Sequence, residues 1–206
     1  MKKGIFIVIE GIDGSGITTQ SKLLADWFSK KGFRVFLTSE PSEGGIGKLL
    51  RTYLKNNSIN PAIDALLFAA DRVEHTETIK KKLEEGYVVI SSRYFESSIA
   101  YQSSQGIPID WIEKINKYAI PPDITIILDA PPEVTIERVE KRNSISHKDK
   151  EKFERIDFLH KVRTVFLSRA SKFSNYHTVN ATRDINTVHK EIVRIIDEYV
   201  KKIFKG

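Results

Sequence analysis

A glycine-rich segment directly after an apolar run is the clearest chemical signal in this 206-residue sequence. Gly11-Ile12-Asp13-Gly14-Ser15-Gly16-Ile17-Thr18 has the spacing G-x-x-x-x-G-x-[ST], with the strand-like run Ile5–Ile9 before it and a helical pattern after it. Glycines in such a loop let backbone N–H groups converge on one anion, and the following helix adds its positive N-terminal end. The hydroxyl of Thr18 is placed to bind a magnesium ion. The segment predicts a phosphate-binding loop; a glycine-rich turn that binds nothing is the alternative interpretation.

Position 17 of this loop holds isoleucine, where phosphate loops with this spacing carry lysine. That lysine contacts the β- and γ-phosphates of a nucleotide and follows their charge into the transition state. Isoleucine donates no hydrogen bond, and losing one preorganised donor costs roughly 10²–10³ in rate. Ile17 therefore predicts phosphate binding through backbone amides, with slower phosphoryl transfer unless cations elsewhere replace the lysine.

Strand-like apolar runs alternate with helical patterns along the chain. The runs are 5–9, 34–38, 87–90, 124–128 and 177–180, and the helical patterns are about 18–31, 46–55, 61–85, 133–141, 150–172 and 185–203. This alternation predicts an α/β fold, with a parallel sheet covered by helices on both faces. Ligands of such folds bind at the carboxyl ends of the strands, where Arg93, Asp129 and Glu40 stand. Asp129 and Glu40 are candidate metal ligands, and capping of the next turn is the alternative role for Asp129.

The composition excludes several classes of protein. The chain has no cysteine, which excludes a disulfide framework, thiol catalysis and metal sites with cysteine ligands. No apolar run approaches the roughly 18 residues of a transmembrane helix, and the run after Met1 is typical of a buried strand rather than a signal peptide. We therefore expect a cytoplasmic protein without membrane contact. The net charge of +6 is spread along the chain, which favours small phosphorylated ligands over nucleic acid.

Further motifs follow the loop in a fixed order. They are Thr18-Thr19-Gln20, Glu40-Pro41, Leu66-Leu67-Phe68-Ala69-Ala70-Asp71-Arg72, Arg93-Tyr94, Ser97-Ser98 and Ala100-Tyr101-Gln102. Together with the loop, these motifs resemble those of the thymidylate kinase family over nearly the whole chain. Two more positions depart from the family pattern: Ser39 replaces the arginine of its R-E-P segment, and Ser92 replaces the aspartate of its D-R-Y segment. Serine supplies no negative charge for holding magnesium or orienting the attacking phosphate.

The resemblance implies the three-layer fold of P-loop NTPases, with a parallel five-stranded sheet, helices on both faces and a helical lid. It implies a single domain over residues 1–206, with the phosphate loop at 11–18, a monophosphate-binding region at about 39–102 and the lid at about 138–155. The implied reaction transfers the γ-phosphoryl group of ATP to dTMP, gives dTDP and ADP, and uses Mg²⁺ as a cofactor. Because thymidylate kinases are typically homodimers, we also expect a homodimer.

The resemblance also implies roles for individual residues. The catalytic set is Asp13, Arg93, Arg142 and Lys152, of which the last two lie in the lid. The ATP-binding set is Gly11, Ile12, Asp13, Gly14, Ser15, Gly16, Ile17, Thr18, Thr19 and Arg183. The metal candidates, Thr18 and Asp129, follow instead from the loop spacing and from the acidic end of a strand-like run. The dTMP-binding set is Asp13, Arg51, Phe68, Arg72, Arg93, Ser97, Tyr101 and Gln102. From spacing alone, Phe68 and Arg72 share one helix face, which also fits a core phenylalanine beside a surface arginine.

Three alternatives remain open. A kinase for another deoxynucleoside monophosphate differs only in substrate, and a panel of substrates separates it from a dTMP kinase. A nucleotide-binding paralogue with weakened catalysis is motivated by Ile17 and Ser92, and it predicts dTMP binding with negligible turnover. A nucleic-acid-binding P-loop module has only the basic charge behind it, and weak, salt-insensitive binding to oligonucleotides excludes it.

Overall fold

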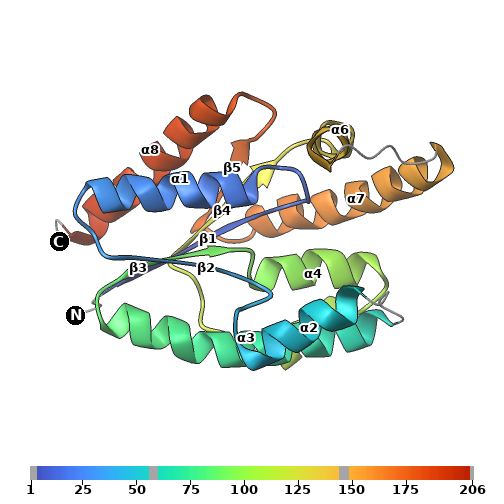
Figure 1. Cartoon of the computed structure of the whole chain (residues 1–206), viewed down its shortest axis with the longest axis horizontal. Helices are drawn as coiled ribbons and strands as arrows, with labels where there is room; N and C mark the ends of the chain where they lie inside the picture. Colours follow the sequence, from blue (N-terminus) through green and yellow to red (C-terminus); the bar gives the residue numbers. More distant parts are fainter. Residues whose placement is uncertain (1–3, 56–59, 144–148, 205–206) are drawn as a thin grey trace.

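The computed structural model of the chain describes residues 4–55, 60–143 and 149–204, without the side chains of 143, 149–153 and 202–204. Its elements, in chain order, are β1 (Ile5–Gly11), α1 (Ile17–Lys30), β2 (Val35–Ser39), α2 (Gly45–Lys55), α3 (Pro61–Glu84), β3 (Val88–Ser92), α4 (Phe95–Ser104), α5 (Ile109–Ile115), β4 (Ile124–Asp129), α6 (Pro132–Asn143), α7 (Asp149–Ala170), β5 (Tyr176–Asn180) and α8 (Ile185–Phe204). The five strands form one parallel sheet in the order β2-β3-β1-β4-β5. Helices cover both of its faces, as the alternation of strands and helices predicts (Figure 1).

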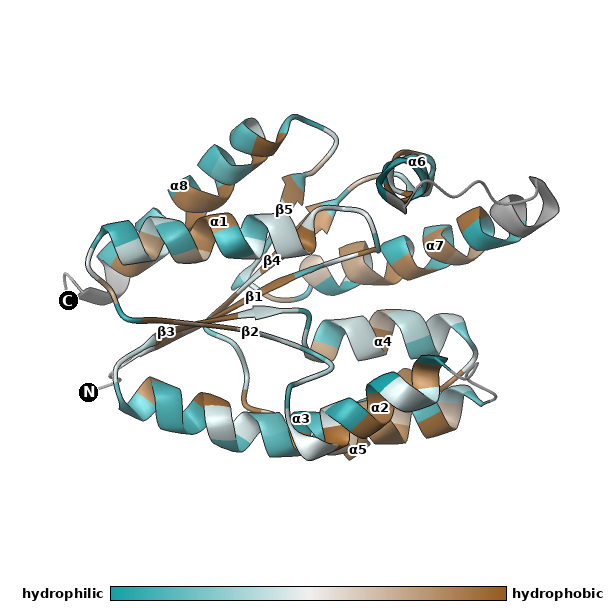
Figure 2. Cartoon of the chain, in the orientation of Figure 1, coloured by the Kyte–Doolittle hydropathy of each residue, from teal (hydrophilic) through white to brown (hydrophobic). Residues whose placement is uncertain are grey.

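Alternation along β1 decides which side chains meet which layer of helices. Ile5, Ile7 and Ile9 join the apolar cluster beneath α1 and α8, whereas Phe6 and Val8 pack on the opposite face with Ile79 of α3 and Tyr94. Since successive side chains of a strand point to opposite faces, Glu10 lies on the same face as Phe6 and Val8. Strands β1, β3 and β4 are predominantly apolar (Figure 2).

The predicted strands and long helices are confirmed, with boundaries that differ by at most a few residues. At the start of α3, Pro61 occupies the first helical turn, and the side chain of Asn60 accepts a hydrogen bond from the backbone N–H of Ala62. Two helices escaped the sequence pattern, α4 and α5. The expected lid at 138–155 spans the end of α6 and the start of α7, and residues 144–148 lie outside the described part of the chain.

The carboxyl ends of the strands meet at one edge of the sheet. The phosphate loop follows β1 there, Ser39 and Ser92 end neighbouring strands in register, and Asp129 ends β4 beside Asn180 of β5. This is the edge at which open α/β sheets bind ligands. Among the described helices, none is long and apolar enough to span a membrane.

Candidate active site

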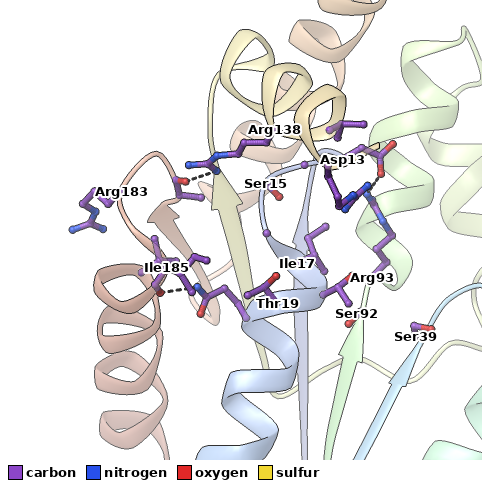
Figure 3. Close-up of a pocket in the computed structure, with 18 of the residues that line it drawn as sticks. Asp13, Ser15, Ile17, Thr19, Ser39, Ser92, Arg93, Arg138, Arg183 and Ile185 are labelled. Atoms are coloured by element: carbon purple, nitrogen blue, oxygen red, sulfur yellow. Dashed lines mark hydrogen bonds and ion pairs between the residues drawn. The ribbon is translucent and has the colours of Figure 1, made fainter. Parts of the chain in front are cut away.

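A cavity of about 850 Å³ lies over the phosphate loop at this edge (Figure 3). It is lined by the loop and first turn of α1, by the ends of β2 and β3, by α6, and by the loop after β5. We call it the donor pocket. Of the predicted ATP-binding residues, it brings together Asp13, Gly14, Ser15, Gly16, Ile17, Thr18, Thr19 and Arg183.

The backbone of the phosphate loop needs glycine at its turn. Gly14 has φ +87, and a Cβ atom there would lie 2.4 Å from the carbonyl oxygen of Thr135 in α6. Gly16, with φ 104, is the N-cap residue of α1 and has no side chain to fill the space above the helix. Backbone N–H groups of the loop and of α1 are thereby left open toward the donor pocket, which is the arrangement that binds phosphate.

Ile17 forms part of both the donor pocket and the apolar core. Its side chain is 6% exposed and packs in the cluster with Ile9, Leu24 and Ile126. The first turn of α1 therefore presents a methyl surface where a lysine ammonium would carry positive charge. Cations reach the donor pocket from other elements, namely Arg93, Arg138, Arg142, Arg155 and Arg183.

One end of the donor pocket is built from α6 and the loop after β5. Arg138 donates from Nη1 to the carbonyl oxygen of Ala181 at 2.8 Å, and from Nη2 to that of Thr182 at 3.3 Å. Gln20 of α1 donates from Nε2 to the carbonyl oxygen of Ile185 at 2.9 Å (Figure 3). Ile185 itself is 57% exposed, so this end offers an apolar surface framed by arginines. Such a surface suits a flat heteroaromatic base.

A second cavity of about 450 Å³ opens between α3, α4 and the phosphate loop. We call it the acceptor pocket. It brings together seven of the predicted dTMP-binding residues: Asp13, Phe68, Arg72, Arg93, Ser97, Tyr101 and Gln102. Gln102 is 5% exposed, and its buried Oε1 has no hydrogen-bond partner among the described residues. A buried acceptor without a partner is costly unless a ligand satisfies it.

Arg72 is held in a buried network on one wall of the acceptor pocket. Its Nε and Nη2 donate to Glu40 Oε2 at 2.8 and 2.5 Å, and Nη1 donates to Asn116. Nη2 also reaches the backbone of Tyr94 and the hydroxyl of Ser98. These bonds account for four of the five N–H groups of the guanidinium. Arg72 therefore has one N–H left for a ligand, and its main role in this structure is to hold β2, α3 and α4 together.

Asp13, Arg93 and Glu40 line both pockets. Arg93 Nη2 donates to Asp13 Oδ1 at 2.5 Å, and Nη1 donates to the carbonyl oxygen of Gly11 and to Ser97 Oγ. Burial alone would lower the pKa of Arg93, but Tyr101, Asp13 and Glu10 together raise it, so the guanidinium stays charged. A fixed cation thus stands where the two pockets meet.

The backbone of Arg93 is in the left-handed region, with φ 68, which is uncommon for a residue with a side chain. Its N–H donates to the carbonyl oxygen of Ile9, and its own carbonyl accepts from Ser91 Oγ at 2.7 Å. The turn between β3 and α4 is therefore tied to β1 on one side and to β3 on the other. This conformation turns the guanidinium toward the phosphate loop, and residues held in such regions cluster at functional sites.

Glu10, at the end of β1, is fully buried beneath this turn. Its Oε1 accepts the backbone N–H groups of Tyr94 and Ser97 at 2.8 and 3.2 Å, and its Oε2 accepts Ser97 Oγ at 2.5 Å. Burial raises the pKa of Glu10 to about 7, although Ser97, Arg93 and the N–H of Tyr94 favour the charged form. A buried carboxyl that titrates near neutrality therefore lies behind Arg93.

Some predicted residues are not among the described residues that line the two pockets. Asp129 lines neither, because both of its carboxylate oxygens accept from Arg163 of α7, at 2.6 and 3.0 Å. Binding of a metal ion at Asp129 would require this bidentate ion pair to break. Arg51 donates to the carbonyl oxygens of Pro41 and Ser42, so it braces the segment behind the acceptor pocket. Lys152 lies in α7, but its side chain is outside the described residues.

Sequence reasoning gave no role to three residues that build the site. Glu10 was missed, although the alternation along β1 would have placed it on the face with Phe6 and Val8. Gln20 belongs to the Thr18-Thr19-Gln20 motif, but no sequence pattern indicates that its side chain donates to the carbonyl oxygen of Ile185. For Ile185 the signal was an apolar residue two positions after Arg183, a predicted ATP-binding residue.

A phosphate loop between the first strand and first helix of a parallel β2-β3-β1-β4-β5 sheet, with an arginine-lined cavity above it, defines a P-loop nucleotide-binding protein. The family model of thymidylate kinase matches residues 9–192. A probable thymidylate kinase of Pyrobaculum calidifontis is 46% identical over 195 residues, which covers 94% of this chain and 96% of that protein. One of Thermococcus gammatolerans is 42% identical over 208 residues, or 96% and 98% of the two chains. The chain belongs to the thymidylate kinase family, which confirms the resemblance and makes the protein a phosphotransferase.

Proposed function

We propose that this protein transfers the γ-phosphoryl group of ATP to dTMP and releases dTDP and ADP. The observation that carries the proposal is the wall shared by the two pockets, where Arg93 and Asp13 face both cavities. A nucleoside triphosphate on the phosphate loop and a monophosphate in the acceptor pocket would bring their phosphates together at this wall. The family model and the names of the relatives support the same reaction.

The chemistry needs positioning and charge more than it needs a general base. A phosphate monoester is largely ionised near neutral pH, so one of its oxygens attacks the γ-phosphorus directly. The bond from this phosphorus to its bridging oxygen breaks in line, and ADP leaves with the electron pair. Arg93, with Arg142 and Lys152 from the predicted lid, neutralises the transferring group, and these cations replace the lysine that Ile17 removes.

Magnesium fits the donor pocket through few protein ligands. Mg²⁺ in phosphotransferases keeps several waters and takes one or two protein oxygens in addition to the substrate phosphates. Thr18 offers its hydroxyl, and Glu40 is a carboxylate of the same pocket that is already bonded to Arg72. Among the described residues, no group of three or more acidic, histidine or cysteine side chains is arranged for a metal. When bound, the ion would neutralise charge on the ATP phosphates.

The acceptor pocket favours a thymine nucleotide through two kinds of contact. Phe68 and Tyr101 offer aromatic surfaces to a flat base, and the unsatisfied Oε1 of Gln102 is an acceptor for a ring N–H. A panel of dTMP, dUMP, dCMP and dGMP tests this selectivity. Equal kcat/KM values across the panel would contradict it.

An apolar face of α2 and α3 supports a homodimer. Leu49, Ile63, Leu66 and Val73 are 40–59% exposed, and the last three share one side of α3. Exposed apolar residues gathered on one face mark association surfaces. Light scattering should give twice the chain mass, and Leu66→Glu should shift the protein toward monomer, whereas Tyr118→Glu, at a residue 64% exposed outside these helices, should not. A monomeric wild type contradicts the homodimer.

The decisive experiment is release of ADP with ATP, Mg²⁺ and dTMP, run for the wild type beside Ile17→Lys and Ser92→Asp. Turnover that neither change improves supports a dTMP kinase in which other groups replace the missing lysine and aspartate. Binding of dTMP without turnover, with activity restored by Ile17→Lys, supports the alternative of a nucleotide-binding paralogue with weakened catalysis. If dTMP neither binds nor reacts in any variant, the proposed function is wrong.

A further inference from the structure

Helix α4 begins at the acceptor pocket without a cap of its own. Its N-cap residue, Tyr94, makes no side-chain hydrogen bond to the first turn. The first N–H groups of a helix need acceptors, and a buried helix start without them is unfavourable. Here the acceptor comes from another strand, because Glu10 Oε1 of β1 accepts the N–H groups of Tyr94 and Ser97. A carboxylate at this position also complements the positive end of the helix.

The second carboxylate oxygen of Glu10 is connected by hydrogen bonds to Arg93 at the junction of the two pockets. Glu10 Oε2 accepts the hydroxyl of Ser97 at 2.5 Å, and this fixes the Ser97 proton on the side of Glu10. The lone pairs of Ser97 Oγ then face Arg93, whose Nη1 donates to them at 3.0 Å. A chain of two hydrogen bonds therefore connects a fully buried carboxylate with the guanidinium that lines both pockets.

We propose that Glu10 is a positioning residue for the acceptor phosphate, acting through Ser97 and the start of α4 to hold Arg93 at the junction of the two pockets. The proposal rests on the proposed function, because it takes the acceptor phosphate to bind at Arg93. It assigns the working state to ionised Glu10, since only a carboxylate accepts all three donors. A protonated Glu10 donates to Ser97 Oγ instead, and the Ser97 hydroxyl then turns away from it.

Charged and titratable groups around Glu10 come from four segments of the chain. Arg93 from the β3–α4 turn favours its charged form, and Glu96 of α4 opposes it. Glu96 is itself paired with Arg169 of α7 and accepts the hydroxyl of Tyr176 from β5. With burial, these groups place the titration of Glu10 near neutral pH, within the range of an activity assay.

Glu10→Gln isolates the link to Ser97. The amide oxygen of glutamine can still accept the N–H groups of Tyr94 and Ser97, but its NH₂ group faces Ser97 Oγ as a donor. We expect KM for dTMP to rise about tenfold at about pH 8.5, equivalent to about 1.4 kcal/mol, with KM for ATP unchanged. KM for dTMP of Glu10→Gln, divided by KM for dTMP of the wild type, should fall toward one at about pH 6, because wild-type Glu10 is protonated there. Taking this ratio cancels the titration of dTMP itself.

A double-mutant cycle tests the route through Ser97. Glu10→Gln should raise KM for dTMP in the wild-type background and leave it unchanged in the Ser97→Ala background, because the connecting hydroxyl is absent. Tyr176→Phe is the matched control, since it removes one buried hydrogen bond from Glu96 beside the same helix. It should leave KM for dTMP at about pH 8.5 as in the wild type, because the link from Glu10 through Ser97 to Arg93 is intact. A ratio that is flat with pH, additive effects in the cycle, or tighter dTMP binding by Glu10→Gln would overturn the proposal.

A measurement without substrate separates this inference from the proposed function. In the ligand-free protein, NMR should show the Nε of Arg93 and the amides of Tyr94 and Ser97 titrating with one midpoint near neutral pH, and this titration should be absent in Glu10→Gln. If this holds while dTMP is not phosphorylated, the proposed function is wrong and the role of Glu10 in positioning Arg93 stands. If dTMP is phosphorylated but Arg93 does not titrate with Glu10, the inference is wrong.

Discussion

Arg93 Nη2 and Asp13 Oδ1 lie 2.5 Å apart in the wall that separates the donor pocket from the acceptor pocket. The pair joins the phosphate loop to the turn after β3, two segments 80 residues apart in the sequence. Because Asp13 is 55% exposed and Arg93 is 22% exposed, both side chains still face the cavities. The guanidinium is thus oriented before either nucleotide binds, which reduces the cost of arranging it in the transition state.

Replacing Arg93 should therefore lower the catalytic activity by more than the loss of its positive charge alone would. We expect Arg93→Ala to lower kcat/KM for dTMP by about 10²–10³, as for loss of a preorganised donor. Arg93→Lys keeps the charge but loses the planar fork that contacts Asp13, Gly11 and Ser97 together, so its activity should lie between those of Arg93→Ala and the wild type. Steady-state kinetics of the three proteins test this order. Activity of Arg93→Ala within about threefold of the wild type would contradict the assignment of Arg93 to the reacting centre.

Replacing each of two buried glutamines should raise KM for a different substrate. Gln20 lies in the donor pocket and bonds to Ile185, whereas Gln102 lies in the acceptor pocket. We expect Gln20→Leu to raise KM for ATP several-fold with little change for dTMP, and Gln102→Leu to do the reverse, since one hydrogen bond contributes about 0.5–1.5 kcal/mol. Each variant serves as the control for the other. Equal effects on both KM values in both variants would show that the two pockets are not separate.

Gly14 should tolerate no side chain. Gly14→Ala places a Cβ 2.4 Å from the backbone of Thr135 in a left-handed conformation, so the loop or α6 has to move. We expect loss of ATP binding, measured by calorimetry. Gly32→Ala is the matched control, because Gly32 has nearly the same φ (+84) and nothing within 4 Å of the added Cβ. It should cost about 1 kcal/mol of stability and leave ATP binding intact.

Stability should fall as Glu10 ionises. The pKa of this group is about 7 in the folded protein against 4.5 for the free side chain, so the folded state binds the proton more tightly. The free energy of unfolding should therefore decrease by about 3 kcal/mol between roughly pH 4.5 and 7 on account of Glu10 alone. Chemical denaturation of the wild type and Glu10→Gln across this range measures the difference. A difference that stays constant with pH would contradict the raised pKa.

Arg169 should matter for stability and not for substrate specificity. Its guanidinium donates to both oxygens of Glu96 and to Glu113, and its side chain is 8% exposed. Arg169→Ala leaves the buried carboxylate of Glu96 unpaired, and breaking such a pair costs about 3–5 kcal/mol. The exposed pair Arg194–Glu198 on α8 provides the control, since Arg194→Ala should cost below about 0.5 kcal/mol. Thermal or urea unfolding of both variants distinguishes them.

The strands and most helices were predictable because their patterns are local. Five apolar runs with Gly or Pro between them and helical spacing in the intervals suffice for the parallel sheet. Helix α4 was missed because Phe95–Ser104 has a weak apolar pattern and carries no capping residue of its own. Its cap is Glu10, 84 residues away from Tyr94, and no local signal in the sequence connects the two.

The candidate site likewise has a part that was predictable from local sequence and a part that was not. Residues of the phosphate loop were predictable from their spacing after a strand-like run. The aromatic and polar residues of α3 and α4 were predictable as pocket residues because their motifs resemble those of the thymidylate kinase family. The partners of these residues were not predictable. Asp129 illustrates this, since its place at a strand end suggests a ligand but Arg163, 34 residues later, binds both of its oxygens. Which side chains pair with one another depends on the packing of elements that are distant in the sequence. The pattern of a single segment carries no information about that packing.

The direction of the parallel strands has a practical consequence for handling the protein. Strand β1 starts at Ile5 at the amino edge of the sheet, and α8 runs back to end at Phe204 on the same side, whereas both nucleotide pockets open at the carboxyl edge (Figure 1). The seven residues of β1 extend over about 20 Å. A tag, fluorophore or surface linker joined near Ile5 or Phe204 would therefore be attached about one strand length from the pockets, and the immobilised protein would present its nucleotide-binding edge to solution.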